Sequence, residues 1–290
     1  IIPETVEVIG KQAFYGAEKL SQVKLPSILT KIGSEAFQGT GLTSVTIPDR
    51  VTEIDDQAFD GIAKLTSVTL PQSLTRIGNY AFYGATNLTE IALPATLESI
   101  GSNAFSGTGL TEVVIPENVS YVGSSAFASS QLTRVEFEQG TRYIKIMIDS
   151  SAFEGCRNLK KIQLSENVNY LGQNIIKGTA IESLTIPKSV ESCYVSYGEG
   201  PLTGAEYLKE IIFEEGMKAI PEKIAYNAKS IEQVIIPETV EVIGKQAFQG
   251  TGLTSVTIPD RVTEIDDQAF DGIAKLTSVT LPQSLIRIGN

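Results

Sequence analysis

The 290-residue chain contains no histidine, no tryptophan and only two cysteines. Without histidine there is no Ser-His-Asp or Cys-His nucleophile system, no histidine-ligated metal and no histidine-based pH switch. Two cysteines are too few for a disulfide scaffold or for a zinc site made of four thiolates. We therefore expect a protein that is not an enzyme, has no catalytic residues and binds neither a metal ion nor a cofactor.

Basic residues and long apolar runs are also scarce. The chain has 23 lysine and arginine residues against 34 aspartate and glutamate residues, which gives a net charge of −11. This sign disfavours binding to the phosphates of nucleic acids or to anionic lipid. No apolar run reaches the ~18 residues that a spanning helix needs, so we expect no membrane insertion. The sequence shows no signal peptide, but it does not begin with methionine, so this says nothing about a precursor.

What the chain does contain is an internal repeat of 22 or 23 residues. The segments LTSVTIPDRVTEIDDQAFDGIAK (42–64) and LTSVTLPQSLTRIGNYAFYGATN (65–87) align without a gap. The period predicts a single array over residues 1–290, with about 13 rows of 22 to 27 residues, of which rows 1 and 13 are incomplete. Row 1 starts at Ile1, and rows 2 to 13 begin at Leu20, Leu42, Leu65, Leu88, Leu110, Leu132, Leu159, Ile181, Leu208, Ile231, Leu253 and Leu276.

Each row has the same order of residue types, counted from its first residue. Proline occupies position 7 in ten rows, and an Ala-Phe pair occupies positions 17 and 18 in nine. In row 3, Val45 and Ile47 alternate with small polar residues, as in a short half-buried strand that Pro48 ends. A glycine at position 14 marks a turn that we expect to need a positive φ, and the glycine at position 20 reverses the chain into the next row.

Stacking of the rows is the expected outcome, because no row can bury its own apolar stripe. The alanine of the Ala-Phe pair permits close approach of neighbouring rows, and the phenylalanine fills the middle of the coil. Thirteen rows spaced by about 4.8 Å give a solenoid roughly 60 Å long. Its Leu-x-x-Val-x-Ile strands are predicted to form a parallel sheet along one face.

The row pattern L-T-x-V-x-I-P-x-x-V-x-x-I-G-x-x-A-F-x-G closely resembles the BspA-like class of leucine-rich repeats, which occur in surface proteins of bacteria and some protists. The resemblance covers essentially the whole chain. It implies a right-handed leucine-rich repeat superhelix, a repeat solenoid with a parallel β-sheet on one face and short strands, turns and 3-10 or helical turns on the other. It also implies a cell-surface or secreted location, a role in adhesion, and no catalytic residues to carry over.

Departures from the repeat cluster in an irregular central zone, residues 132–230. Row 7 inserts about four residues, and row 9 loses its Ala-Phe pair to the stretch SYGEGPLTGAEY (196–207). Strand positions that are mostly serine or threonine elsewhere become charged, and six of the ten tyrosines fall here. Tyrosine and arginine beside protruding loops are typical of protein interfaces, although repeat decay at tolerant positions is the alternative. The candidate ligand-binding residues are Arg134, Glu136, Tyr143, Lys161, Tyr194 and Tyr197.

These observations predict a non-enzymatic protein-binding or adhesion solenoid that recognises extracellular or host proteins or glycans. The alternative is a passive spacer, or a stalk whose uncapped rows associate end to end. Residues 36–79 recur as residues 247–290 with one change, Thr75 to Ile286. Packing tolerates any similar aliphatic set and does not require such identity, so it indicates duplication of row cassettes.

Three smaller signals have plain structural interpretations. Cys156 and Cys193 are expected to be buried free thiols, because they lie two rows, about 10 Å, apart. The acidic run from Asp49 to Asp60 lacks the spacing of a calcium loop, so we expect a solvated acidic surface. The stretch GEGPLTG (198–204) lacks the lysine and the helix start of a phosphate loop and is expected to be a surface loop.

Overall fold

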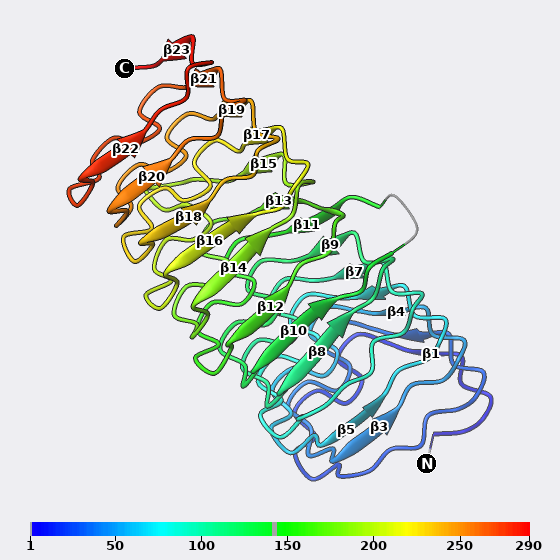
Figure 1. The fold of residues 1–290 in the computed structure, drawn as a ribbon. Helices are drawn as coiled ribbons and strands as arrows, with labels where there is room; N and C mark the ends of the chain where they lie inside the picture. The colour runs from blue at the N-terminus through cyan, green and yellow to red at the C-terminus, as the bar shows by residue number, and fades with distance from the viewer. Residues whose placement is uncertain (1, 141–143) are drawn as a thin grey trace.

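The computed structural model describes residues 2–140 and 144–290, and it is an elongated solenoid of stacked rows (Figure 1). Consecutive rows contribute neighbouring strands, and every pair of these strands is parallel. The predicted parallel β-solenoid is therefore confirmed. Each row has three sides, which we call the first face, the second face and the third side. In the part of the chain that the structure describes, no helix is long and apolar enough to cross a membrane.

The first face carries strands at row positions 3 to 6, where inward apolar residues alternate with outward polar ones. In β3, Val45 is buried while Ser44 and Thr46 are exposed. This face is divided into the sheets β3-β5, β8-β10-β12, β14-β16-β18 and β20-β22. Its strands are β3 (Ser44–Thr46), β5 (Ser67–Thr69), β8 (Glu112–Ile115), β10 (Arg134–Phe137), β12 (Lys161–Gln163), β14 (Ser183–Ile186), β16 (Glu210–Phe213), β18 (Gln233–Ile235), β20 (Ser255–Thr257) and β22 (Ser278–Thr280).

The second face carries shorter strands around positions 12 and 13. Short strands were expected opposite the first sheet, but their pairing into sheets of their own was not predicted. They form a nine-stranded sheet from β1 to β15 and a four-stranded sheet from β17 to β23. The position-13 residues, such as Ile54 and Ile77, point into the core and are fully buried. Its strands are β1 (Val8–Ile9), β2 (Lys31–Ile32), β4 (Glu53–Ile54), β6 (Arg76–Ile77), β7 (Ser99–Ile100), β9 (Tyr121–Val122), β11 (Ile146–Ile148), β13 (Val168–Leu171), β15 (Ser192–Cys193), β17 (Ala219–Ile220), β19 (Val242–Ile243), β21 (Glu264–Ile265) and β23 (Arg287–Ile288).

The third side consists of turns, and none of the described residues is helical, so the expected 3-10 or helical turns are not found. On this side, successive backbone N–H groups alternate between donating a hydrogen bond to the next row and donating one within their own row. The N–H of Phe37 donates to the carbonyl oxygen of Ala58 in the next row, whereas the N–H of Gln38 donates to Glu35 in its own row. A helix would direct all of these donors within the row. The alternation satisfies them while also tying each row to the next.

Left-handed backbone at two positions makes this alternation possible. Position 20 is left-handed, with a φ of 70° at Gly61. Position 16 is left-handed as well, although Gln57 and Tyr80 stand there with φ values of 59° and 56°. The expectation for position 14 is wrong, because its glycines do not have a positive φ. A Cβ on Gly101 would lie 2.6 Å from the backbone nitrogen of Asn79, so glycine at position 14 of row 5 permits the close packing of this row on row 4.

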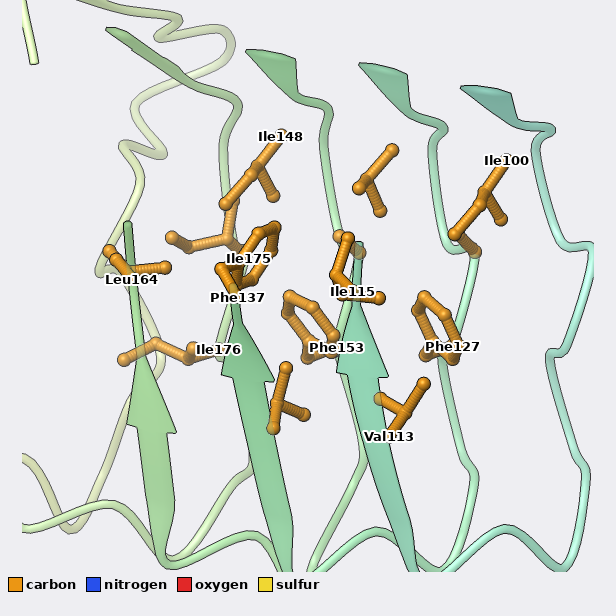
Figure 2. Close-up of a cluster of buried hydrophobic side chains, with 14 of the residues drawn as sticks. Ile100, Val113, Ile115, Phe127, Phe137, Ile148, Phe153, Leu164, Ile175 and Ile176 are labelled. Atoms are coloured by element: carbon orange, nitrogen blue, oxygen red, sulfur yellow. The ribbon is translucent and has the colours of Figure 1, made fainter. Parts of the chain in front are cut away.

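Phenylalanines at position 18 form the centre of the solenoid. Their rings stack row upon row from Phe14 to Phe153, with neighbouring centroids 5.1 to 5.6 Å apart. The stack ends at row 8, where Ile175 and Ile176 replace the Ala-Phe pair. Phe137 from position 6 of row 7 belongs to the same buried cluster as these isoleucines (Figure 2). The predicted core role of the phenylalanines is confirmed.

Row 10 shows a related exchange. Its position 18 is the small residue Ala225, and Phe213 from position 6 meets Phe248 of row 11 edge to face, with centroids 6.0 Å apart. The ring that is missing at position 18 is thus replaced from another position of the same row. Rows 8 to 10 therefore interrupt the phenylalanine stack, which resumes between Phe248 and Phe270.

The nine-stranded sheet of the second face ends where a proline stands at position 14. In row 4 the N–H of Gly78 at this position donates to the carbonyl oxygen of Ile54 one row earlier, at 2.8 Å. Pro221 of row 10 has no N–H, so it cannot donate to the carbonyl of Cys193 in row 9. The sheet accordingly stops at β15, and a new one starts at β17.

Interruptions of the first face follow a different sequence feature. Strands β12 and β14 lie on consecutive rows but do not pair, and neither do β18 and β20. Both breaks follow a 22-residue row that ends with a buried threonine, Thr179 or Thr251, whose Oγ1 donates to the carbonyl of the position-18 residue. Rows 2 and 5, which form no first-face strand, end with Thr40 and Thr108 in the same place. The first face is thus a series of short sheets.

Candidate binding surface

The six candidate residues do not form one site. Arg134 and Glu136 lie on β10 and Lys161 on β12, so these three share the first face. Tyr194 follows β15 on the second face, and Tyr197 lies in the loop inserted after it. The sixth candidate, Tyr143, lies outside the described residues. The structure thus brings three candidates together and places the tyrosines elsewhere in the same rows.

The three first-face candidates form a charged strip. Arg134 is in register with Lys161, and Glu136 with Gln163. The guanidinium of Arg134 makes an ion pair with the carboxylate of Glu136. Lys161 is exposed and has no ionic partner among residues 2–140 and 144–290. Exposed ion pairs contribute little to stability, so we expect these charges to contribute little to the free energy of folding.

Tyr197 occupies the tip of a two-residue hairpin. The N–H of Ser196 donates to the carbonyl of Glu199 at 3.1 Å, and the N–H of Glu199 donates back at 2.9 Å. Between them Tyr197 and Gly198 have φ values of 50° and 78°, as in a type I′ turn. A tyrosine with a left-handed backbone is uncommon. Its side chain is fully exposed, at 103% of the reference area.

Rows on both sides hold this hairpin in place. The Nδ2 of Asn174 donates to Oε2 of Glu199 at 2.7 Å, and the ammonium of Lys177 lies 3.5 Å from Oε1. Because the Asn174 hydrogen bond and the Lys177 charge favour the ionised form, the pKa of the Glu199 carboxyl lies below its usual value. On the other side, the Nδ2 of Asn227 donates to the carbonyl of Gly198 at 2.9 Å. Tyr197 is therefore presented on a fixed support.

A cavity of about 570 Å³ lies against the hairpin. Gly198 and Glu199 contribute to its lining, together with residues of rows 9 and 10. Glu206 and Lys229 also line it, and neither has an ionic partner within the described part of the chain. The volume is in the range of sites that hold a small molecule or an anchoring side chain. The two free charges of opposite sign could each pair with a ligand.

A second cavity, of about 390 Å³, coincides with the break between β12 and β14. Its lining includes Lys161 and Gln163 from β12 and Thr185 from β14. The unpaired ammonium of Lys161 therefore stands at a gap in the first face. Lys161 is the candidate residue that the structure places both on the charged strip and at a cavity.

Sequence reasoning missed the residues that support Tyr197. Asn174 at position 16 and Asn227 at position 20 both have left-handed backbones. Asparagine is the residue that replaces glycine there most readily, and its amide can then make further hydrogen bonds. The asparagine at position 20 of row 10 was the available signal. Nothing in the sequence pointed to Glu206 and Lys229, because in a repeat sequence a charged residue that lines a cavity cannot be distinguished from one that is simply solvated.

Two sequence expectations need correction. Asp60 was expected on a solvated acidic surface, but it is buried, with 8% of its area exposed, because the turn of row 3 packs against rows 2 and 4. The stretch 198–204 was expected to be a surface loop, but Leu202 within it is fully buried. The N–H of Gly178 donates to Gly204, so this stretch continues the third side of the array.

The cysteines are free, as expected. Cys156 is buried, and Cys193 is half-buried. Burial raises the pKa of both thiols, that of Cys193 to about 12, so neither is a thiolate nucleophile at neutral pH. Over residues 2–140 and 144–290, no group of three or more cysteine, aspartate or glutamate side chains is arranged to hold a metal ion.

Comparison with known proteins gave three kinds of result. A family model described as BspA type leucine rich repeat region matches in six copies, over residues 1–89, 75–197, 123–254 and 203–290. A leucine-rich repeat protein from Bacteroides ovatus is 27% identical, with 97% of this chain and 82% of that chain covered and a TM-score of 0.47. The pneumococcal vaccine antigen PcpA is 20% identical (96% and 78% covered, TM-score 0.48). A leucine rich cell surface protein from Faecalibacterium prausnitzii is 23% identical (98% and 73% covered, TM-score 0.40). No curated protein matches the chain.

Proposed function

The chain belongs to the BspA-type leucine-rich repeat family, and on this premise we propose that it is a non-enzymatic, protein-binding solenoid of the adhesin type. Its partners are extracellular or host proteins or glycans, and its location is the cell surface or the extracellular space. Repeat arrays of this kind offer an extended surface for recognition rather than a single enclosed site. The net charge of −11 argues against nucleic acid as a partner.

The observation that carries this proposal is the supported hairpin with Tyr197 at its tip. A fully exposed aromatic ring on a loop fixed from both sides has no role in folding. Tyrosine is among the residues that most often dominate a binding interface, and a pre-formed loop lowers the entropy cost of binding. The neighbouring cavity of about 570 Å³ would receive a side chain or sugar of the partner. Arg134, Glu136 and Lys161 would set specificity from the first face, and Tyr194 from the second.

Capture of immobilised extracellular-matrix proteins and glycans by the full chain tests the proposal. Tyr197→Ala should weaken capture at least about tenfold, since a central aromatic anchor contributes on the order of 2 kcal/mol or more. Tyr15→Ala is the matched control, because Tyr15 is also exposed, at 57%, but lies in a regular row. Equal losses in both variants, or no loss in Tyr197→Ala, would remove the case for the hairpin.

The charged strip is tested in the same assay. Arg134→Ala and Lys161→Ala should lower capture a few-fold and reduce its dependence on salt, because rim charges act mainly on the association rate. Thr46→Ala and Thr69→Ala, on the exposed side of β3 and β5, should change nothing. If the array is instead a passive stalk, none of these variants will matter, and light scattering will show an apparent mass that grows with concentration.

A further inference from the structure

A second set of tyrosines lies on the second face, away from the hairpin. Tyr121 of β9, Met147 of β11 and Tyr170 of β13 are direct neighbours in the register of the nine-stranded sheet. Position 12, which they share, points away from the core, and Met147 is 41% exposed. In the other rows this position is either charged, as at Lys31 and Glu53, or small or aliphatic, as at Ser99, Ser192 and Ala219. Aromatic and thioether side chains occupy the outward column only in rows 6 to 8 of the described residues.

Asp149 stands beside this column at position 14 of row 7. Its Oδ2 accepts a hydrogen bond from the hydroxyl of Tyr121 at 2.9 Å, and its Oδ1 accepts one from the N–H of Ser150. The same position in row 8 is Gly172, which has no side chain, and in row 9 it is Tyr194, which is 48% exposed. Tyr121 thus contacts one half-buried carboxylate, and Tyr170 and Tyr194 lie in the next two rows on the same face.

The carboxylate of Asp149 differs from the other aspartates at position 14. Asp55 of row 3 lies 3.5 Å from the ammonium of Lys31, and Asp266 of row 12 lies 3.5 Å from the guanidinium of Arg287. Within the part of the chain that the structure describes, Asp149 makes no ion pair with a lysine or an arginine. Its carboxylate accepts hydrogen bonds from the hydroxyl of Tyr121 and the N–H of Ser150. Position 14 pairs with a positive charge in the two other rows where it is acidic, and within residues 2–140 and 144–290 no such ion pair forms at Asp149.

The electrostatic environment of the tyrosines agrees with this grouping. Burial, then the hydrogen bond and the charge of Asp149, raise the pKa of Tyr121 above its ordinary value. Burial and the nearby charges of Asp149 and Tyr194 raise the pKa of Tyr170 in the same direction. At neutral pH the tyrosines are uncharged, and of these causes the negative charge of Asp149 is the one that would stabilise a cation.

We propose that Tyr121, Asp149, Tyr170 and Tyr194 bind an organic cation, either an alkylammonium or a guanidinium group. The faces of aromatic rings attract cations, most strongly when several rings and a carboxylate act together. The net charge of −11 would also draw cations toward the chain over a longer range. The site rests in part on the proposed function, because Tyr194 belongs to both surfaces. Tyr121, Asp149 and Tyr170 belong to rows 6 to 8, whereas the hairpin belongs to row 9, and the ligand here is a charge rather than a particular protein.

Fluorine NMR of the full chain, labelled with 3-fluorotyrosine, tests the proposal. Choline chloride should shift the signals of Tyr121, Tyr170 and Tyr194 saturably, while sodium chloride and 3,3-dimethyl-1-butanol, the neutral isostere of choline, should not. Tyrosine-to-phenylalanine variants assign the signals. Titration with Nα-acetyl-lysine methylamide and Nα-acetyl-arginine methylamide distinguishes a protein side chain from a quaternary ammonium ligand as the preferred source of the cation.

Variants separate a built site from the general attraction of an acidic protein. Asp149→Asn should weaken the cation affinity about fivefold or more, and Tyr194→Leu, an exposed change that leaves the core intact, about two- to fivefold. Asp55→Asn is the matched control, because it removes the same charge from the same row position on the same face, where no tyrosine is adjacent. Absence of saturable shifts in the wild type, or an equal loss in Asp55→Asn, would overturn the proposal.

Discussion

At the scale of the residue, the duplicated cassettes place identical sequences in different surroundings. Asp60 and Asp271 occupy the same place in the repeated segment, and each accepts a hydrogen bond from a glutamine of the preceding row. Asp60 is buried whereas Asp271 is exposed. The chemistry of an aspartate therefore depends on which rows lie beside it, and each duplicated residue offers a control for its copy.

Asp60→Asn should raise the stability of the protein at neutral pH. Burial raises the pKa of Asp60, so the folded state binds the proton more tightly than the unfolded state, in which the pKa is about 3.9. Stability is then lost as the pH rises through the folded-state pKa. The asparagine variant avoids this loss and should gain about 1 kcal/mol at pH 7, with the difference vanishing below pH ~3.9. Urea unfolding at pH 4 and pH 7 measures it.

Asp271→Asn is the control for this change. Because Asp271 is exposed, its substitution should alter the free energy of unfolding by less than about 0.5 kcal/mol at either pH. A loss of stability in Asp60→Asn at pH 7 would show that its hydrogen bonds outweigh the cost of burying its charge.

At the scale of the element, a two-residue strand such as β4 or β19 has no stability of its own. It exists because the neighbouring rows hold it on both sides, and position 14 decides how closely they approach. A Cβ at Gly244 would lie 2.6 Å from the carbonyl oxygen of Ile220, whereas one at Gly10 would meet nothing within 4 Å. These glycines occupy the same place in duplicated sequence.

Gly244→Ala should therefore destabilise the protein by about 1 to 3 kcal/mol, because rows 10 and 11 must move apart to accept the methyl group. Gly10→Ala should be neutral or slightly stabilising, since the added Cβ has free space and reduces the entropy of the unfolded chain. Thermal unfolding followed by circular dichroism compares the two. Similar losses of stability in both variants would mean that the distance between neighbouring rows does not decide which residues position 14 tolerates.

At the scale of the whole molecule, three continuous systems connect the rows, and all of them are interrupted between rows 8 and 10. The phenylalanine stack ends at Phe153, the first face breaks between β12 and β14, and the nine-stranded sheet ends at β15. The supported hairpin and the cavity beside it lie in these same rows. Because coupling in a repeat array passes between neighbouring rows, this zone is where cooperativity should be weakest.

Phe105→Ala tests this division. Removal of a fully buried ring from the middle of the stack should cost about 3 to 5 kcal/mol. Hydrogen exchange measured by mass spectrometry should show the lost protection in rows 2 to 8, while rows 11 and 12 keep theirs. Equal loss of protection along the whole chain would mean that the array unfolds as one unit.

Much of this architecture was predictable because the same order of residue types recurs in most rows. The alternation around Val45, the proline at position 7 and the phenylalanine at position 18 led to a parallel solenoid with a phenylalanine core, which is confirmed. Short strands on the second face were expected from the family resemblance, but their pairing into sheets was not predicted, because a two-residue strand leaves no alternation to detect. The candidate residues remain predictions, and the structure separates them into a first-face strip and a hairpin.

The sequence by itself determined the period of the repeat, the identity of the core residues and the rows that depart from the pattern, since each of these depends on local residue order. Only the tertiary structure decided what the broken zone presents. The support of Tyr197 by Asn174 and Asn227, and the meeting of Tyr121 with Asp149, join residues 22 or more positions apart. Such contacts depend on the register between stacked rows, which inserted residues shift and which no single row encodes.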